Sequence, residues 1–337
     1  MIKKVNKKKH RILKIVLMIS LLFLFSLFLY LFYLTKQTNY DGSKDKQIQV
    51  NEDSNEEMEG YFNIAIFGVD SRENQLVQDT RSDAIMIASI NNQTKDVKLC
   101  SIYRDTYLHL PGHGFDKINH AYYYGGYSLS LSTINMNLDL DIKNYVTLNF
   151  KSVVKVIDAL GGITLKIKKN ELEYLNGYVR EINRVNNTSV TSLKKAGKQK
   201  VNGTQALAYA RIRFTSGGDF KRAKRQRIVV RKVLKKAKTL DMVTLNQIIN
   251  DVLPEIYTNL DSGEILSLAK NILSYSIADQ TGFPFDKETP TINDTSYVTA
   301  IDLAANVRRL HAYLFDTADY TPSEAVQTIS EEIEKVR

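Results

Sequence analysis

The sequence predicts an α/β protein, a layered α-β-α sandwich around a central mixed sheet, preceded by one N-terminal transmembrane helix. Composition sets the frame, because 337 residues with 43% hydrophobic and 25% charged side chains are typical of a folded globular chain. From residue 61 onward, apolar runs of strand length alternate with stretches of helical spacing, which is typical of layered α/β domains. Close to the N-terminus, residues 15–34 form a single apolar run.

The apolar run over residues 15–34 is interrupted only by Ser20 and Ser26. At a helical rise of about 1.5 Å per residue it spans about 30 Å, the thickness of a bilayer core. A cluster of Lys and Arg precedes it, so the positive-inside rule makes residues 1–14 a cytoplasmic tail and exports everything after Leu34. The alternative is a cleaved signal peptide, but the run is longer than such a segment and no small-x-small site follows it.

The formal net charge of +9 suggests a nucleic-acid binder, but its distribution does not. Residues 1–36 hold eight basic and no acidic side chains, and residues 37–60 hold two basic and seven acidic ones. The first group orients the membrane segment, and the second predicts that residues 35–60 are a polar, acidic, flexible stalk. The net charge of +9 thus divides into separate parts, and the remaining segment, residues 61–337, carries +6 of it. Because the charge is explained by parts with different roles, we expect no nucleic acid among the partners.

Period-2 and continuous apolar patterns predict the strands of the exported domain. The polar segment 91–96 is a plausible turn, so the strands on either side of it should form a hairpin. The strands expected from these patterns are Tyr61–Val69, Asp83–Ile90, Val97–Ile102, Tyr145–Phe150 and Ile163–Ile167. The lone Cys100 cannot form an internal disulfide and is expected to be a small buried side chain in its strand.

Helical spacing and end signals predict four helices. Gly161 and Gly162 end the first of them, and Asp261 with Glu264 forms a capping box at the start of the third. The helices are Ser152–Leu160, Asp219–Lys238, Asp261–Tyr275 and Leu303–Phe315. No boundary divides residues 61–316, which we take as one extracytoplasmic domain, and residues 317–337 are expected to be a polar tail.

Acidic and basic side chains gather where the first strands begin and end. Asp70 follows the first strand and Asp83 opens the second, so the two meet at one edge if these strands are neighbours. Paired carboxylates beside arginines such as Arg81 and Arg104 suggest a Mg²⁺ site that serves a phosphate substrate. The alternative is that these residues are turn residues and surface ion pairs.

A second cluster of arginines occupies residues 211–226. Arg211 and Arg213 are two apart, so on a strand they would face the same side, and Asp219 is a candidate N-cap for the following helix. Arg222, Arg225 and Gln226 then share one helical face, and guanidinium groups near a helix N-terminus match phosphate oxygens. The alternative is a solvated basic helix face, but the nearby acids are too few to pair with so many arginines.

Between these clusters lies FDKINHAYYYGG, in which Lys117, Asn119 and His120 could reach a phosphate or an acceptor. The spacing of His109, His113 and His120 matches no zinc motif, and no Cys pair supports one. We therefore expect these histidines to be helix or packing residues.

The order of these motifs resembles the LytR–CpsA–Psr family of cell-envelope phosphotransferases. The segments that carry the resemblance lie behind an apolar N-terminal run and extend to about residue 240. They are GVDSR with RSDAIMI, SIYRDTYL, DKINHAYYYGG, ALGGITL, and AYARIRF followed by GGDFKRAKRQR. Two positions depart from the family pattern: Tyr103 replaces a usual Pro and Lys221 a usual Gly.

The resemblance implies transfer of a glycopolymer from a polyprenyl-diphosphate carrier to peptidoglycan, at the outer side of the cell membrane. It implies that Asp70 and Asp83 hold Mg²⁺ or Mn²⁺, and that Arg104, Asp105 and Asp219 are catalytic. The residues expected to bind the diphosphate are Arg81, Arg104, Lys117, Arg211, Arg213, Arg222, Arg225 and Gln226. Two alternatives remain open, a lipid-diphosphate pyrophosphatase and a non-enzymatic surface protein that binds polyanions.

Overall fold

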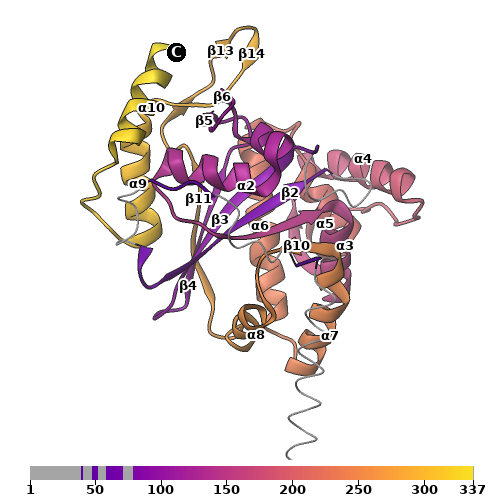
Figure 1. Cartoon of the computed structure of the whole chain (residues 1–337). Helices are drawn as coiled ribbons and strands as arrows, with labels where there is room; N and C mark the ends of the chain where they lie inside the picture. Colours follow the sequence, from indigo (N-terminus) through magenta and orange to yellow (C-terminus); the bar gives the residue numbers. More distant parts are fainter. Residues whose placement is uncertain (1–38, 41–47, 52–57, 71–78, 337) are drawn as a thin grey trace, which may run out of the picture.

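The computed structural model describes residues 39–40, 48–51, 58–70 and 79–336. As predicted, helices cover a central mixed sheet (Figure 1). This sheet has seven strands in the order β1-β10-β7-β2-β3-β4-β11. Its strands are β1 (Asn39–Tyr40), β2 (Tyr61–Val69), β3 (Ser82–Asn91), β4 (Asp96–Ile102), β7 (Asn144–Asn149), β10 (Ile256–Thr258) and β11 (Ser276–Phe283).

The sheet is mixed because its middle is an antiparallel meander and other strands join it in parallel. β2 pairs with β3 and β3 with β4 in antiparallel fashion, through the predicted turn 91–96. β7 runs parallel to β2, and β11 runs parallel to β4. The long segments needed for the parallel connections carry most of the helices.

Helices flank the sheet, and four short two-stranded sheets of the described residues lie outside it. The helices are α2 (Ile118–Leu138), α3 (Phe150–Ala159), α4 (Lys169–Asn186), α5 (Gly203–Arg211), α6 (Gly218–Ala237), α7 (Met242–Val252), α8 (Ser262–Lys270), α9 (Leu303–Phe315) and α10 (Glu324–Lys335). The short sheets pair β5 (Tyr107–Leu110) with β6 (Gly114–Lys117), β8 (Ile163–Ile167) with β9 (Gly197–Val201), β12 (Lys287–Glu288) with β15 (Thr299–Ala300), and β13 (Thr291–Ile292) with β14 (Thr295–Ser296).

Alternation along the strands divides the apolar side chains between two cores. On β2, Ala65 and Phe67 face the core shared with α2, α9 and α10, whereas Ile64 faces the core shared with α6 and α8. On β4, Cys100 is fully buried in the first core, as expected, and burial raises the pKa of its thiol to about 12. The alternation of side chains along each strand therefore corresponds to the two packed faces of one sheet.

The strand Ile163–Ile167 exists, but it does not belong to the central sheet. As β8 it pairs with β9 in a separate two-stranded antiparallel sheet, which packs on α4 and α5 around a core of its own that includes Ile163, Leu175 and Ala206. The next part of the chain, α4, was not predicted. This subdomain carries one wall of the site described below.

The predicted polar C-terminal tail, residues 317–337, is wrong. Residues Glu324–Lys335 form the amphipathic helix α10, and Val326 and Ile333 are buried in the main core. The Ser323 side chain accepts a hydrogen bond from the Val326 N–H and caps the helix. Apolar residues at positions 326, 329 and 333 follow helical spacing, so the sequence did contain this signal.

Part of the predicted stalk lies against the domain. The backbone N–H of Gln49 donates to Ser132 Oγ, the Asn51 side chain reaches Met136 O, and Met58 is buried. A flexible stalk over the whole of 35–60 is therefore wrong for these residues. The apolar run 15–34 lies outside the described residues, and no helix within them is long and apolar enough to cross a membrane.

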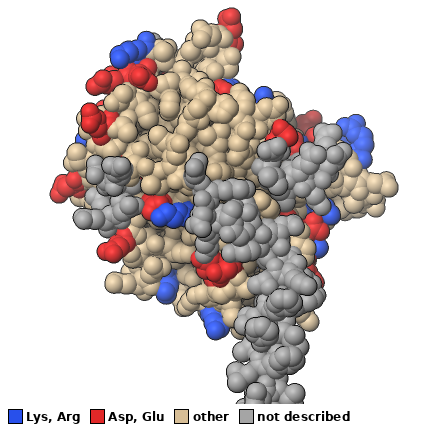
Figure 2. All heavy atoms as spheres, in the orientation of Figure 1, with Lys and Arg blue, Asp and Glu red and all other residues tan. Residues whose placement is uncertain are grey.

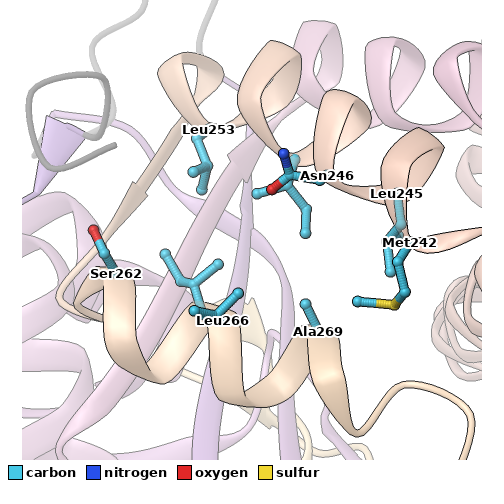
Figure 3. A pocket seen from close by; sticks show the side chains of 9 residues that line it. Met242, Leu245, Asn246, Leu253, Ser262, Leu266 and Ala269 are labelled. Atoms are coloured by element: carbon cyan, nitrogen blue, oxygen red, sulfur yellow. The ribbon is translucent and has the colours of Figure 1, made fainter. Parts of the chain in front are cut away.

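The other predicted strands and helices are present with small shifts of boundary. The capping box of Asp261 and Glu264 is present, but α8 ends at Lys270 and not at Tyr275. A small apolar cavity of about 30 Å³ lies between α8 and α7, and Figure 3 shows Leu245 and Leu266 approaching it from the two helices.

The surface charge is mixed on the face of the molecule that Figure 1 also shows. In Figure 2, side chains of both charge signs are spread over the described part of this face, without one basic patch.

Candidate functional site

A cavity of about 370 Å³ brings together five of the charged residues that the sequence singled out, together with Gln226. It is lined by Asp70, Asp83, Phe150, Tyr178, Glu181, Arg211, Arg213, Phe214, Arg222 and Gln226. Asp70 follows β2 and Asp83 lies in β3, and the pairing of Val69 with Ser82 places them at one edge of the sheet, as expected.

Arg211 and Arg213 reach the cavity, but the predicted strand beneath them is wrong. Arg211 is the last residue of helix α5, and Arg213 follows in an irregular segment. The Asn202 side chain and Gln205 form a capping box, and the Ala- and Leu-rich sequence after it favours a helix. Arg211 therefore lies at the C-terminal end of a helix, and Arg213 lies two residues beyond that end.

Asp219 is not the N-cap of α6. The N-cap is Gly217, at a φ of +87° that suits glycine, and Asp219 lies in the first turn. The Asp219 carboxylate instead contacts Arg222 Nη2 at 2.8 Å and Arg104 Nε at 3.5 Å. The Asp219 carboxylate therefore pairs with two arginines of the site.

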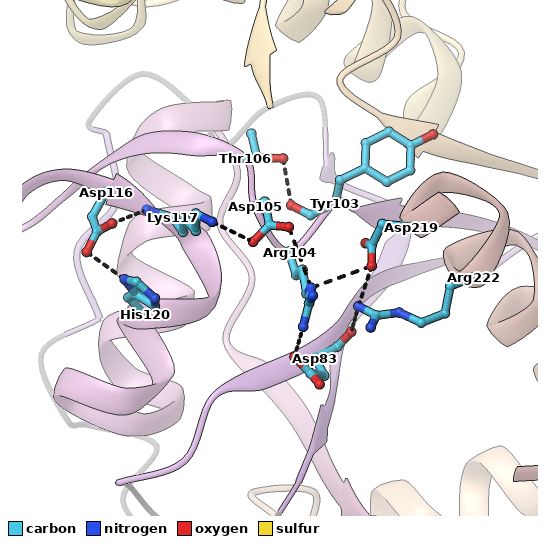
Figure 4. A network of polar contacts seen from close by, with 10 residues as sticks. All are labelled: Asp83, Tyr103, Arg104, Asp105, Thr106, Asp116, Lys117, His120, Asp219 and Arg222. Atoms are coloured by element: carbon cyan, nitrogen blue, oxygen red, sulfur yellow. Dashed lines mark hydrogen bonds and ion pairs between the residues drawn. The ribbon is translucent and has the colours of Figure 1, made fainter. Parts of the chain in front are cut away.

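Arg104 is the hub of an ion-pair network beside the cavity (Figure 4). Its Nη1 donates to Asp83 Oδ1 at 2.6 Å, and its Nε lies 3.6 Å from Asp105 Oδ2. Lys117 Nζ contacts the other oxygen of Asp105 at 3.2 Å. The network therefore joins β3, the loop after β4, the start of α2 and the start of α6.

Burial changes the proton affinities of the groups around this hub. Burial raises the pKa of Asp219, although Arg222 and Arg104 oppose it. Burial lowers the pKa of Arg222, whose side chain is only 7% exposed, and Asp219 counters part of this effect. Burial alone would lower the pKa of Arg104, but the neighbouring Asp83 raises it overall. The centre is thus partly desolvated, which strengthens its interactions with a charged ligand.

Arg225 lies on the same helix as Arg222, but it does not line the cavity. It is 4% exposed, its Nη2 contacts Glu171 at 2.9 Å, and it also donates to Ile212 O and Thr215 Oγ1. Arg225 therefore fixes the 212–215 segment next to Arg213. Arg81 is exposed and also lies outside the cavity lining.

The acids that pair with the second arginine cluster come from α4, which the sequence analysis missed. Glu171 holds Arg225, and Glu181 Oε1 contacts Arg211 Nη2 at 3.0 Å. The Arg211 guanidinium also lies over the rings of Phe150 and Tyr178. Few acids lie nearby in the sequence, as expected, but Arg211 and Arg225 find acidic partners that are distant in sequence.

Tyr103, at a position where the family pattern has Pro, packs its ring edge-to-face on Phe220 at 4.6 Å. The Lys287 ammonium group lies 5.2 Å from both ring centres. These contacts hold the loop that carries Arg104 against the start of α6. Packing of the Tyr103 ring thus restricts the movement of this loop, as a proline at this position would.

The carboxylates fit a hard cation that also binds phosphate. Within the described residues no three His, Cys, Asp or Glu side chains are grouped to hold a metal. Asp70 and Asp83 nevertheless both line the cavity, and Asp83 uses Oδ1 for Arg104. Mg²⁺ is commonly bound by one or two carboxylates together with substrate phosphates, so two acids at an open cavity suit it.

Comparison with known proteins agrees with this geometry. A model described as the LytR_cpsA_psr family matches residues 27–308, most of the chain. The chain belongs to the LytR–CpsA–Psr family. In this member of the LytR–CpsA–Psr family, the motifs around Asp70, Asp83, Arg211 and Arg222 meet at one cavity.

Relatives within the family include cell-wall enzymes. The chain is 31% identical over 229 residues to the polyisoprenyl-teichoic acid–peptidoglycan teichoic acid transferase TagU of Enterococcus faecalis, covering 67% of this chain and 69% of that one. It is 32% identical to biofilm regulatory protein A of Streptococcus mutans, covering 75% of this chain and 64% of that one.

Solved structures of LytR–CpsA–Psr proteins share the fold. A structure described as TagT bound to LIIa-WTA matches with a TM-score of 0.63 at 23% identity, covering 81% of this chain and 97% of the other. A second, the family protein YwtF (TagT) with bound octaprenyl pyrophosphate lipid, matches with a TM-score of 0.59 at 22% identity, covering 82% and 99%.

Proposed function

We propose that this chain is a membrane-anchored phosphotransferase that moves a glycopolymer from a polyprenyl-diphosphate carrier to peptidoglycan. The observation that carries the proposal is the cavity in which Arg211, Arg213 and Arg222 converge with Asp70 and Asp83. A diphosphate is the ligand whose charge and oxygen geometry match such a set. The family membership and the names of the TagU and TagT relatives support it.

The arginines of the cavity hold the diphosphate. Arg222 and Arg213 donate to its oxygens, and Gln226, one turn beyond Arg222 on α6, adds a neutral donor. Arg211 is held by Glu181 and by two aromatic rings, so its planar donors are fixed before the substrate arrives. Preorganised cations stabilise the charge that develops during phosphoryl transfer without needing to reorient.

In the reaction, an acceptor hydroxyl oxygen forms a bond to the phosphorus that carries the sugar. The bond from this phosphorus to the bridging oxygen breaks, and polyprenyl monophosphate leaves with the electron pair. The hydroxyl proton passes to the Asp219 carboxylate, whose pKa is raised by burial, which favours proton uptake. Arg104 and Arg222 keep Asp219 oriented.

Asp70 and Asp83 are the residues that hold Mg²⁺ or Mn²⁺, since both prefer oxygen ligands. When bound, the ion neutralises charge on the diphosphate oxygens. Arg104 keeps Asp83 in place through the 2.6 Å contact of its Nη1.

The apolar run 15–34 anchors the enzyme in the cell membrane, with residues 1–14 in the cytoplasm and the catalytic domain outside. The lipid carrier is confined to the same membrane. A tether therefore raises its effective concentration at the cavity, because both partners diffuse in two dimensions.

The test uses the full chain in lipid vesicles with a polyprenyl-diphosphate-linked glycopolymer, peptidoglycan and Mg²⁺. Polyprenyl phosphate release and polymer attachment are measured together. We expect Arg222→Ala to lower both by about 100-fold or more, as loss of a charge-stabilising donor does. Arg231→Ala, on the exposed side of the same helix, is the matched control and should stay within about twofold.

The same assay separates the alternatives. Equal release of polyprenyl phosphate without peptidoglycan would indicate a hydrolase, which contradicts transfer. Absence of both activities, with polymer binding that weakens smoothly as salt rises, would indicate a binding protein. Asp70→Ala should abolish the Mg²⁺-dependent release while leaving the fold intact, and unchanged turnover would refute the metal assignment.

A further inference from the structure

Three aromatic side chains form an exposed surface that the proposed reaction does not use. We call His113, Tyr123 and Tyr124 the aromatic platform. Tyr123 and Tyr124, on α2, are 46% and 44% exposed, and His113 lies in the turn between β5 and β6. The rings of His113 and Tyr124 are stacked at 4.6 Å with an interplanar angle of 4°, and Tyr123 meets Tyr124 edge-on at 5.6 Å.

Asp116 fixes the platform in one arrangement. Its Oδ2 lies 2.7 Å from His120 Nδ1 and 3.4 Å from the Tyr124 hydroxyl, which donates to it. Its Oδ1 accepts from the Lys117 N–H at 2.7 Å. Exposed tyrosines that are already ordered lose little conformational entropy when a ligand stacks on them, which is the usual reason for preorganising a binding surface.

The platform is joined to the reaction centre through its neighbour Lys117. Lys117 Nζ contacts Asp105, and Asp105 contacts Arg104. The Asn119 N–H, in the first turn of the helix that carries the tyrosines, donates to Arg104 O at 3.1 Å. Figure 4 shows Asp116 and His120 on one side of Arg104, and Arg222 on the other.

None of the platform residues lines the arginine cavity. A transferase that joins two polymers needs separate places for donor and acceptor on either side of the reacting phosphorus. The arginine cavity has the cations that a diphosphate donor requires. The platform instead offers ring faces with hydroxyl and imidazole groups at their edges, and such surfaces suit an amphipathic ligand that is neither strongly charged nor purely apolar.

We propose that the aromatic platform is the acceptor subsite, and that it binds the sugar rings of a peptidoglycan glycan strand. This inference rests on the proposed function. The C–H faces of the sugars stack on Tyr123 and Tyr124, and their hydroxyl and acetamido groups bond to polar atoms around the rings. His120 contributes its second ring nitrogen, for which the described residues provide no partner.

The experiment measures binding apart from catalysis. The full chain in detergent is titrated by calorimetry with a short peptide-free strand of alternating N-acetylglucosamine and N-acetylmuramic acid, and separately with a short-chain prenyl diphosphate. We expect the double variant Tyr123→Ala/Tyr124→Ala to weaken glycan binding by about tenfold or more, since two ring contacts are lost. Prenyl diphosphate binding should stay within about twofold.

The matched control is Tyr174→Ala, which removes an exposed tyrosine (40% exposed) from α4. It should leave glycan affinity unchanged, and Tyr123→Phe/Tyr124→Phe should keep most of it because the ring faces remain. Glycan binding that is absent in the wild type, unchanged in the double alanine variant, or lost together with diphosphate binding would overturn the acceptor subsite. Since no turnover is measured, these outcomes do not depend on the transfer assay that tests the proposed function.

Discussion

At the scale of residues, two arginines on one helical face have different surroundings. Arg222 lines the cavity, whereas Arg225, three residues later, is fully engaged by Glu171 and the 212–215 segment. Helical spacing could predict that they share a face, but not that one of them has a buried partner. Arg225 therefore acts as a positioning residue for the segment that carries Arg213.

The buried pair of Glu171 and Arg225 gives a prediction about stability. Both side chains are 5% exposed, so Glu171→Gln leaves a buried guanidinium without its counter-charge. We expect a loss of about 3 kcal/mol in the free energy of unfolding, measured by urea denaturation. Asp286→Asn breaks the exposed pair with Arg309 and should cost less than about 0.5 kcal/mol. Equal costs would show that the buried pair has no special role.

The Asp219 carboxyl gives a prediction about pH. Burial raises its pKa above the ordinary value of about 3.9, and a general base must be ionised. Activity should therefore fall as pH decreases through this raised pKa, so the acid limb of kcat/KM should lie at higher pH than the titration of an ordinary aspartate. Asp219→Asn should remove this limb and lower kcat/KM by about 100-fold or more. An identical acid limb in the variant would exclude Asp219 as the base, and Asp286→Asn should leave the profile unchanged.

At the scale of elements, local signals located five strands and four helices of the described chain, but they missed others, among them α2, α4 and α7. β2 and α9 have the predicted boundaries, and the capping box of α8 is present. The spacing of Arg211 and Arg213 suggests a strand, whereas Arg211 ends helix α5, and the capping box of Asn202 and Gln205 at the start of that helix is a signal present in the sequence. The helix α10 lies in the segment that is predicted to be a polar tail, because polar residues dominate the composition of this segment.

The helix α10 gives a prediction at this scale. Ile333 is 1% exposed in the main core, and its truncation leaves a cavity between α10 and its neighbours. We expect Ile333→Ala to lower the free energy of unfolding by about 3 kcal/mol, measured by urea denaturation. Val336→Ala, at an exposed position just after the helix, should stay within about 0.5 kcal/mol. A similar small effect at both positions would contradict a packed C-terminal helix.

At the scale of the whole molecule, the net charge of +9 has several origins. The N-terminal basic cluster accounts for the largest share, and on the face drawn in Figure 2 the described residues show scattered charges of both signs. At the arginine cavity, three arginines and three acidic side chains line the site, so its cations are gathered locally and are not a net excess. In the proposed topology, the basic cluster beside the apolar run accounts for most of the charge that suggests nucleic acid.

Membrane anchoring gives the prediction at this scale. The full chain should stay in the membrane fraction after an alkaline carbonate wash, because the helix predicted over residues 15–34 would span about 30 Å, the thickness of a bilayer core. A variant that begins at Asn39 keeps β1, which pairs with β10, and should become extractable. In intact cells, external protease should reach the domain of the full chain. Carbonate extraction of the full chain, or protection of its domain, would contradict the predicted topology.

The sequence by itself determined the class of fold, the apolar N-terminal run, the meander of β2, β3 and β4, and the family. These features depend on residues that are close together along the chain, through period, charge runs and turn signals. Only the tertiary structure decided which charged residues share the cavity. The partners of Arg211 and Arg225 lie 30 and 54 residues away, and the pairing depends on how α4 packs beside α5 and α6. Local patterns cannot encode that distance, because burial and electrostatic pairing act through space and not along the sequence.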